Sequence, residues 1–188
     1  QSFLAAVIMG IVFVQNITML EIWQSILTGI SQVTRTTNYN VNFTVAFIIA
    51  MIIPIGMLWF ASKITTTTYA DTTTKMNFAK FGYALIPLDL AGHLGHNLFH
   101  LLTETKAIWY NFVGLFGVYM SGDLAVVSDE TVRIIQFILV FIGTFGSMYA
   151  VYRIGEKKSA KQLWPLYVLM IIFGIANLLL FSLPMDHR

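Results

Sequence analysis

The chain has 188 residues, of which 57% are hydrophobic and only 11% are charged, and its mean hydropathy is +0.74. A soluble domain carries about a quarter charged residues, so this composition excludes an ordinary soluble globular domain. The aromatic content of 14% also excludes a disordered chain. The lack of cysteine excludes disulfides, thiolate metal ligands and a cysteine nucleophile within this sequence.

Long apolar runs predict an all-α fold, a polytopic bundle of membrane-spanning helices that forms one domain over residues 1–188. A helix needs about 20 apolar residues to cross the roughly 30 Å hydrocarbon layer of a bilayer. Five segments meet this requirement, and we expect about five transmembrane helices. Their predicted ranges are residues 3–27, 43–64, 78–103, 132–152 and 163–183.

The positions of lysine and arginine predict the orientation, because cytoplasmic loops are enriched in both. Two loops on one side hold seven of them: Lys63, Lys75, Lys80, Arg153, Lys157, Lys158 and Lys161. The other side mixes four basic with four acidic residues: Arg35, Lys106, Arg133, Arg188, Asp123, Asp129, Glu130 and Asp186. We therefore expect a cytoplasmic N-terminus and an external C-terminus. The external loop at residues 105–131 contains an apolar stretch, Ile108–Phe116, which we expect to lie on the membrane surface or to pack over the bundle.

The third predicted span carries most of the unusual chemistry. At about 100° per residue, six polar side chains share an arc of roughly 100° on this helix. They are called the histidine stripe here, and they are Asp89, His93, His96, Asn97, His100 and Glu104. Polar groups at membrane depth are costly and commonly functional. We expect the stripe to face the bundle interior, a cofactor or another subunit, although a seam that only joins helices is the alternative.

Three kinds of ligand suit the histidine stripe. A transition metal such as copper, zinc or iron would take His93, His96 and His100 with Glu104 as ligands. Haem b would take one histidine as an axial ligand, but a second axial histidine must then come from a partner subunit, since only His187 remains in this chain. A quinone would use the same histidines together with Asp89 and Asn97 as hydrogen-bonding groups.

Depth along the helices predicts that other polar residues gather near the stripe. Counting residues at about 1.5 Å each, Glu21 on the first predicted span lies at the depth of His96, and Asn177 and Gln136 lie in the same half of the membrane. Chains of carboxylates and histidines mark proton relays in membranes. We therefore expect Glu21 and Asp89 to take part in a relay and the site to open outward.

Two stretches resemble a known family. Gly10–Trp23 (GIVFVQNITMLEIW) and Phe81–Leu102 (FGYALIPLDLAGHLGHNLFHLL) are similar to the C-terminal membrane portion of bacterial membrane-bound polyferredoxins, the iron–sulfur proteins of the nitrate- and nitrous-oxide-reductase accessory type. The resemblance implies a bacterial inner-membrane electron-transfer protein that exchanges electrons with quinones or periplasmic partners. The cysteine-rich cluster motifs of that family are absent from this sequence. We expect either that they precede residue 1 in a longer precursor or that only a membrane module is shared.

These observations favour a membrane subunit of a redox complex with an outward-facing site for quinol, haem or metal. The alternative is a metal-handling membrane protein, a transporter or cofactor-assembly factor, and a third possibility is a non-catalytic anchor for a partner helix. Expected partners are the lipid bilayer and other membrane or periplasmic subunits. Motifs of soluble hydrolases, nucleotide-binding enzymes and zinc proteases are absent, and membrane topology explains the basic residues without nucleic acid.

Overall fold

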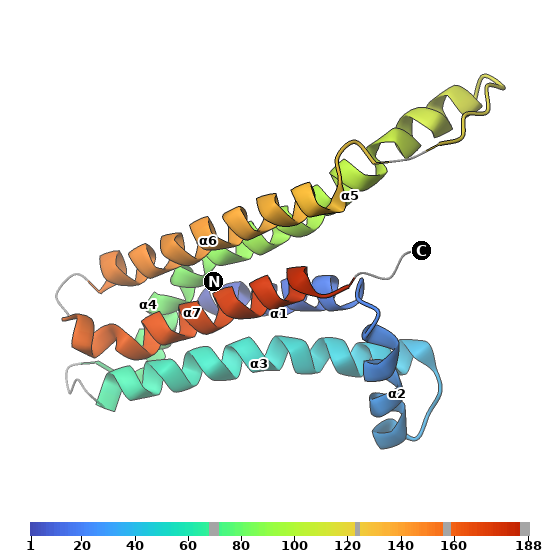
Figure 1. Ribbon diagram of the computed structural model, residues 1–188. Coiled ribbons are helices and arrows are strands. Elements are labelled where there is room, and N and C mark those ends of the chain that lie inside the picture. The colour runs from blue at the N-terminus through green and yellow to red at the C-terminus, as the bar shows by residue number, and fades with distance from the viewer. Residues whose placement is uncertain (68–71, 123–124, 156–158, 185–188) are drawn as a thin grey trace.

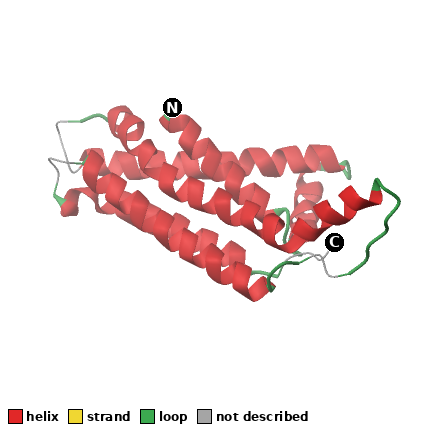
Figure 2. Cartoon of the chain, turned by 90° about the horizontal axis from the view of Figure 1, so that it is seen from above, coloured by secondary structure: helices red, strands yellow, loops and turns green. Residues whose placement is uncertain are grey.

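The computed structural model describes residues 1–67, 72–122, 125–155 and 159–184, and these form an all-helical bundle without strands (Figures 1 and 2). Seven α-helices and one short 3₁₀ helix occur in this part of the chain. They are α1 (Ser2–Ile17), α2 (Trp23–Thr34), α3 (Tyr39–Thr67), α4 (Thr74–Phe81), η1 (Gly82–Leu85), α5 (Ile86–Gly114), α6 (Asp129–Ile154) and α7 (Ala160–Ser182).

Three helices, α3, α6 and α7, are long and apolar enough to cross a membrane. They coincide with the predicted spans at residues 43–64, 132–152 and 163–183, so those helices are confirmed. The structure extends α3 and α6 at both ends, and α7 begins three residues earlier and ends one residue earlier than predicted. Of the about five predicted membrane-spanning helices, three are thus supported by length and composition in the described residues.

The predicted first span, residues 3–27, is wrong as a single helix. Helix α1 has 16 residues and is therefore about 24 Å long, which is shorter than the hydrocarbon layer. It ends where polar residues enter the sequence, and the hydroxyl of Thr18 donates to the carbonyl of Gln15 instead of continuing the apolar pattern. After this turn α2 runs across the bundle axis (Figure 1).

The predicted third span, residues 78–103, also differs from the observed elements. It covers the end of α4, η1 and the first part of α5, and α5 continues to Gly114. Pro87 lies in the first turn of α5, where a proline costs no hydrogen bond. The stretch Ile108–Phe116, predicted as a surface loop, is therefore mainly a continuation of α5, and it projects beyond the other helices (Figure 1).

Capping groups fix where α6 and α7 begin. Ser128 accepts a hydrogen bond from the backbone N–H of Thr131, and Asp129 and Glu130 lie in the first turn of α6, where negative charge is favourable. At α7, Ser159 and Gln162 form a capping box. Both helices therefore begin at polar residues that precede their apolar segments.

Basic residues separate along the bundle axis. The end of the molecule that contains α4, called the α4 end, carries Lys63, Lys75, Lys80, Arg153 and Lys161. The opposite end, called the α2 end, carries Arg35, Lys106 and Arg133 within the part of the chain that is described. Five other charged residues used to predict orientation lie outside the described residues: Lys157, Lys158, Asp123, Asp186 and Arg188.

Small residues let α5 pack closely against its neighbours. A Cβ atom added at Gly143 of α6 would lie 2.4 Å from the Cβ atom of Ala91, and one added at Gly95 would lie 2.9 Å from the ring of Phe181. The hydroxyl of Ser147 also accepts a hydrogen bond of 3.1 Å from the backbone N–H of Leu88. Such close approach is typical of membrane helices, where packing replaces the hydrophobic effect.

The contact between α5 and α6 predicts a large effect of one methyl group. Gly143→Ala should lower the free energy of unfolding by about 1–3 kcal/mol, the usual cost of overpacking, because Ala91 and the backbone at Pro87 leave no room. Gly56→Ala is the matched control, since nothing lies within 4 Å of a Cβ atom there. Thermal unfolding in detergent measures both variants, and equal stability of the two would contradict this packing.

Candidate functional site

The histidine stripe lies along one side of α5, but its six side chains do not converge on one point. Asp89 is buried, with 5% of its surface exposed. His96 and His100 are half-buried, and His93, Asn97 and Glu104 are exposed within this chain. The stripe therefore runs along the edge of the helix–helix contact and not through the bundle interior.

The buried face of α5 consists of Leu88, Ala91, Gly92 and Gly95 together with Asp89. Leu90, Leu94 and Leu101, on the apolar side of the predicted helix, are exposed. The amphipathic pattern located the polar arc but misjudged which face the neighbouring helices cover, because they pack on the small residues.

Helix α1 supplies the partner of His96. Its Nδ1 atom lies 3.1 Å from Oδ1 of Asn16, which accepts a hydrogen bond from the imidazole. Asn16 is buried, with 5% of its surface exposed. The polar pair Gln15 and Asn16 therefore lies at the level of the stripe and closes the site from the α1 side.

The remaining stripe residues pair locally. His96 and His100 have ring centroids 5.2 Å apart, and Nδ1 of His100 lies 3.3 Å from a carboxylate oxygen of Glu104. Asn97 donates to the backbone carbonyl of His93, one turn earlier. Asn97 thus satisfies its own helix, whereas His96, His100 and Glu104 form a row that leads toward the α2 end.

Several buried polar atoms near the stripe have no hydrogen-bond partner among the described residues. They are Oε1 of Gln15, Nδ2 of Asn16, both carboxylate oxygens of Asp89 and Oδ1 of Asn177. The last atom would lie 2.9 Å from a Cβ atom added at Gly92, which places Asn177 of α7 directly against α5. We call Gln15, Asn16, Asp89, His96 and Asn177 the polar cluster. An unpaired buried polar group costs about 1–3 kcal/mol, so this concentration is expensive for the fold.

An open groove between α1 and α5 reaches the polar cluster. Its volume is about 460 Å³, and Gln15, Asp89 and His93 contribute its polar groups on the side toward the α2 end. The other walls are largely apolar, formed by Leu4, Ala5, Ile8, Ile11, Val12, Ile86 and Leu90. At the other end, the Tyr83 hydroxyl donates to the side-chain carbonyl of Gln1. We call this cavity the α1–α5 groove.

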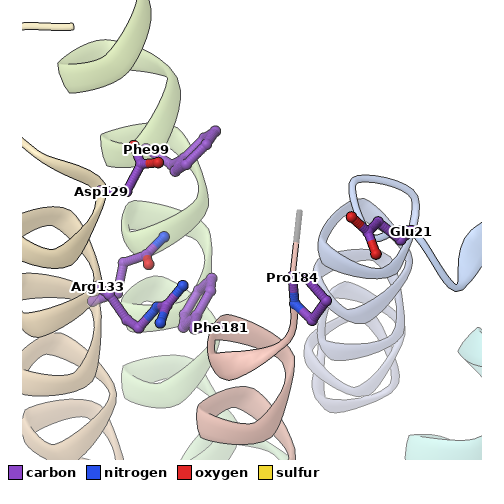
Figure 3. A pocket seen from close by; sticks show the side chains of 7 residues that line it. Glu21, Phe99, Asp129, Arg133, Phe181 and Pro184 are labelled. Carbon is purple, nitrogen blue, oxygen red and sulfur yellow. The ribbon is translucent and has the colours of Figure 1, made fainter. Parts of the chain in front are cut away.

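A second, smaller pocket of about 160 Å³ lies at the α2 end (Figure 3). Glu21 faces Asp129 and Arg133 across it, with Phe181 and Pro184 between them. Gln136 also lines this pocket, and its amide donates to the carbonyl of Gly95, 2.9 Å away. Glu21 therefore belongs to a charged outer pocket and not to the α1–α5 groove, which separates the two residues predicted as a relay.

Within the described residues, no group of three or more histidine, aspartate or glutamate side chains is placed to hold a metal ion. The metal set predicted from the stripe, His93, His96, His100 and Glu104, would need ligands from elsewhere, and it stays a prediction. The haem prediction is likewise untested, since His187 lies outside the described residues.

Comparisons with protein-family models, curated proteins and solved structures found no match for this chain. The resemblance to membrane-bound polyferredoxins therefore stays a prediction.

Because the carboxyl group of Asp89 has no partner among the described residues, we expect it to lower the stability of the fold, as groups kept for function often do. Asp89→Asn should raise the free energy of unfolding by about 1 kcal/mol or more, because the substitution removes the cost of burying an ionisable carboxyl group that has no partner among the described residues. Glu104→Gln should change it little, because its carboxylate is exposed. Unfolding in detergent measures both, and a clear loss of stability in Asp89→Asn would contradict an unpaired carboxylate.

The hydrogen bond between α1 and α5 can be measured by a double-mutant cycle. Asn16→Ala and His96→Ala should couple by about 0.5–1.5 kcal/mol, the range of single hydrogen bonds between membrane helices. The pair Asn97→Ala and Asn16→Ala is the control, since Asn97 bonds within its own helix. Zero coupling between Asn16 and His96 would place the imidazole away from α1.

Proposed function

We propose that this chain is the membrane subunit of an oxidoreductase complex and that its α1–α5 groove binds a quinol. One observation carries the proposal. A buried carboxylate, that of Asp89, lies at the wall of a groove whose other walls are mostly apolar, and both of its oxygens lack a partner among the described residues. A quinol supplies the two features that such a site requires, a hydroxyl donor and a long apolar tail.

Size and access support this ligand. A volume of about 460 Å³ lies within the roughly 300–1,000 Å³ of small-molecule sites, which are mostly apolar with a few placed polar groups. The groove opens sideways between two helices, so that a lipid-soluble molecule could enter from the bilayer. We infer that α1 and α5 lie in the membrane beside α3, α6 and α7, which gives five membrane helices.

The proposed chemistry is the oxidation of a quinol to a quinone. Two O–H bonds break, two protons leave, and two electrons pass to redox centres held by a partner subunit. Asp89 accepts one proton, and His93 accepts the other at its imidazole nitrogen, since both line the groove. Hydrogen bonds from the two hydroxyls to these acceptors hold the quinol before transfer.

The row of side chains beyond the groove provides a proton exit. The rings of His96 and His100 have centroids 5.2 Å apart, and Nδ1 of His100 lies 3.3 Å from the Glu104 carboxylate. Glu104 is exposed toward the α2 end. A neutral imidazole carries a proton on one ring nitrogen and can accept one on the other, so this row can pass protons from the groove to that side. We place the α2 end outside a bacterial inner membrane and the lysine-rich α4 end on its cytoplasmic side.

Binding of a short-chain quinol tests the site directly. Asp89→Asn and His93→Ala should each weaken the affinity of the purified protein for short-chain ubiquinol and menaquinol analogues about tenfold, the effect of losing one hydrogen bond. Ser62→Ala is the control, because Ser62 is also buried and unpartnered but lies on α3, outside the groove. Unchanged affinity for both analogues in Asp89→Asn would refute the proposed site.

Proton release separates the exit row from the binding site. Glu104→Gln and His100→Ala should slow proton release during quinol oxidation by the intact complex several-fold and leave quinol affinity unchanged, because neither residue lines the groove. Lys106→Gln, two residues after Glu104 and therefore on nearly the opposite side of α5, should affect neither quantity. Equal loss of affinity and of proton release would place these residues in the binding site and remove the exit row.

A further inference from the structure

Helix α5 extends beyond the bundle as one unbroken helix. The backbone N–H of Val126 donates to the carbonyl of Leu102 at 2.9 Å, and Phe99 shares the outer pocket with Asp129. Helix α6 therefore begins at the level of residues 99–102 of α5. From there α5 continues to Gly114 without a second helix of the described chain beside it and projects past the ends of α6 and α7 (Figure 1).

Two features mark the membrane surface near the level where α6 begins. Charged residues, Asp129, Glu130 and Arg133, occupy the first turns of α6. Helix α2, in which Trp23 and Leu27 are buried and polar residues alternate with apolar ones, crosses the bundle axis at the same end, as interfacial helices do (Figure 1). We therefore place the limit of the hydrocarbon layer beside Phe99.

The projecting part of α5 reaches farther than lipid does. From Phe99 to Leu115 the helix advances about 24 Å, and a tilt of 40° would still leave about 18 Å. The headgroup region adds only about 5–8 Å on each side of the hydrocarbon. The last turns of α5 thus stand outside the bilayer, and lipid cannot cover them.

One side of this projecting part is nevertheless apolar and exposed. Leucine or isoleucine recurs every seven residues, and the exposed fraction rises along the helix: Leu94 46%, Leu101 56%, Ile108 69% and Leu115 81%. A seven-residue apolar repeat is the pattern of a helix that packs along another helix. Beside this row, Trp109 stacks on Phe112, and Phe112 meets Phe116 edge-on. We call Leu94, Leu101, Ile108 and Leu115 the α5 ridge.

We propose that the α5 ridge docks an apolar helix of a different membrane subunit, one that runs along α5 from inside the bilayer into the space beyond it. A second copy of this chain fits less well. Two copies inserted in the same direction would pair in parallel and bring their Glu104 carboxylates, three residues after Leu101, toward the same seam. Like charges facing one another across such a seam are unfavourable. The docking surface does not depend on quinol binding.

Photo-cross-linking in native membranes tests this surface. A photoreactive phenylalanine analogue is placed singly at Leu101, Ile108 and Leu115 of the full chain, and at Phe145 as control, which is 67% exposed on α6. All three ridge positions should yield an adduct with one and the same protein, and the adduct peptides should map along a single apolar helix of it. Phe145 should yield only lipid adducts.

A charged substitution distinguishes docking from chance proximity. Ile108→Glu should reduce the adduct at position 115 at least tenfold, while the unfolding midpoint of the isolated chain and its quinol affinity stay unchanged, since Ile108 is 69% exposed and remote from the groove. Adducts with a second copy of this chain, with lipid alone, or with a different protein at each ridge position would overturn the proposal. So would an adduct at position 115 that Ile108→Glu leaves unchanged.

Discussion

The arrangement depends on one costly feature, the burial of Asp89 where α1 meets α5. Neither carboxylate oxygen has a partner among the described residues, and unpaired atoms of Gln15, Asn16 and Asn177 lie in the same region. A packed core normally satisfies such groups, so their concentration is the strongest physical sign of a ligand site in the part of the chain that is described. The open groove beside them makes a lipid-soluble ligand the best match.

The fold supports this burial through close packing elsewhere. Glycine and alanine on the inner face of α5 bring α6 and α7 so near that a Cβ atom at Gly143 or Gly95 would clash. Asn16, on the short helix α1, then completes the site by bonding His96. Because α1 stops after 16 residues, the chain turns at the level of the polar cluster, and Glu21 is carried to the outer pocket instead of the groove.

The sequence predicted the helical class, the helices at residues 43–64, 132–152 and 163–183, and the polar arc on α5, because apolar length and helical periodicity are local properties. The prediction failed where contacts between helices determine which residues are buried and which are bonded. No local pattern shows that small residues, and not leucines, form the packed face of α5, or that Asn97 bonds its own backbone. The break after Ile17 was missed because the apolar run resumes at Met19. The depth of Gln15 and Asn16 was the available signal that α1 faces the stripe.

Infrared difference spectroscopy tests the central claim most directly, because carboxyl vibrations report the hydrogen bonding of one buried group. Addition of a short-chain quinol to the purified protein should shift a carboxyl band, and Asp89→Asn should abolish this change, whereas Glu104→Gln should keep it. A quinol-induced carboxyl band that persists in Asp89→Asn, or quinol binding without any carboxyl change in the unaltered protein, would contradict a site built on Asp89.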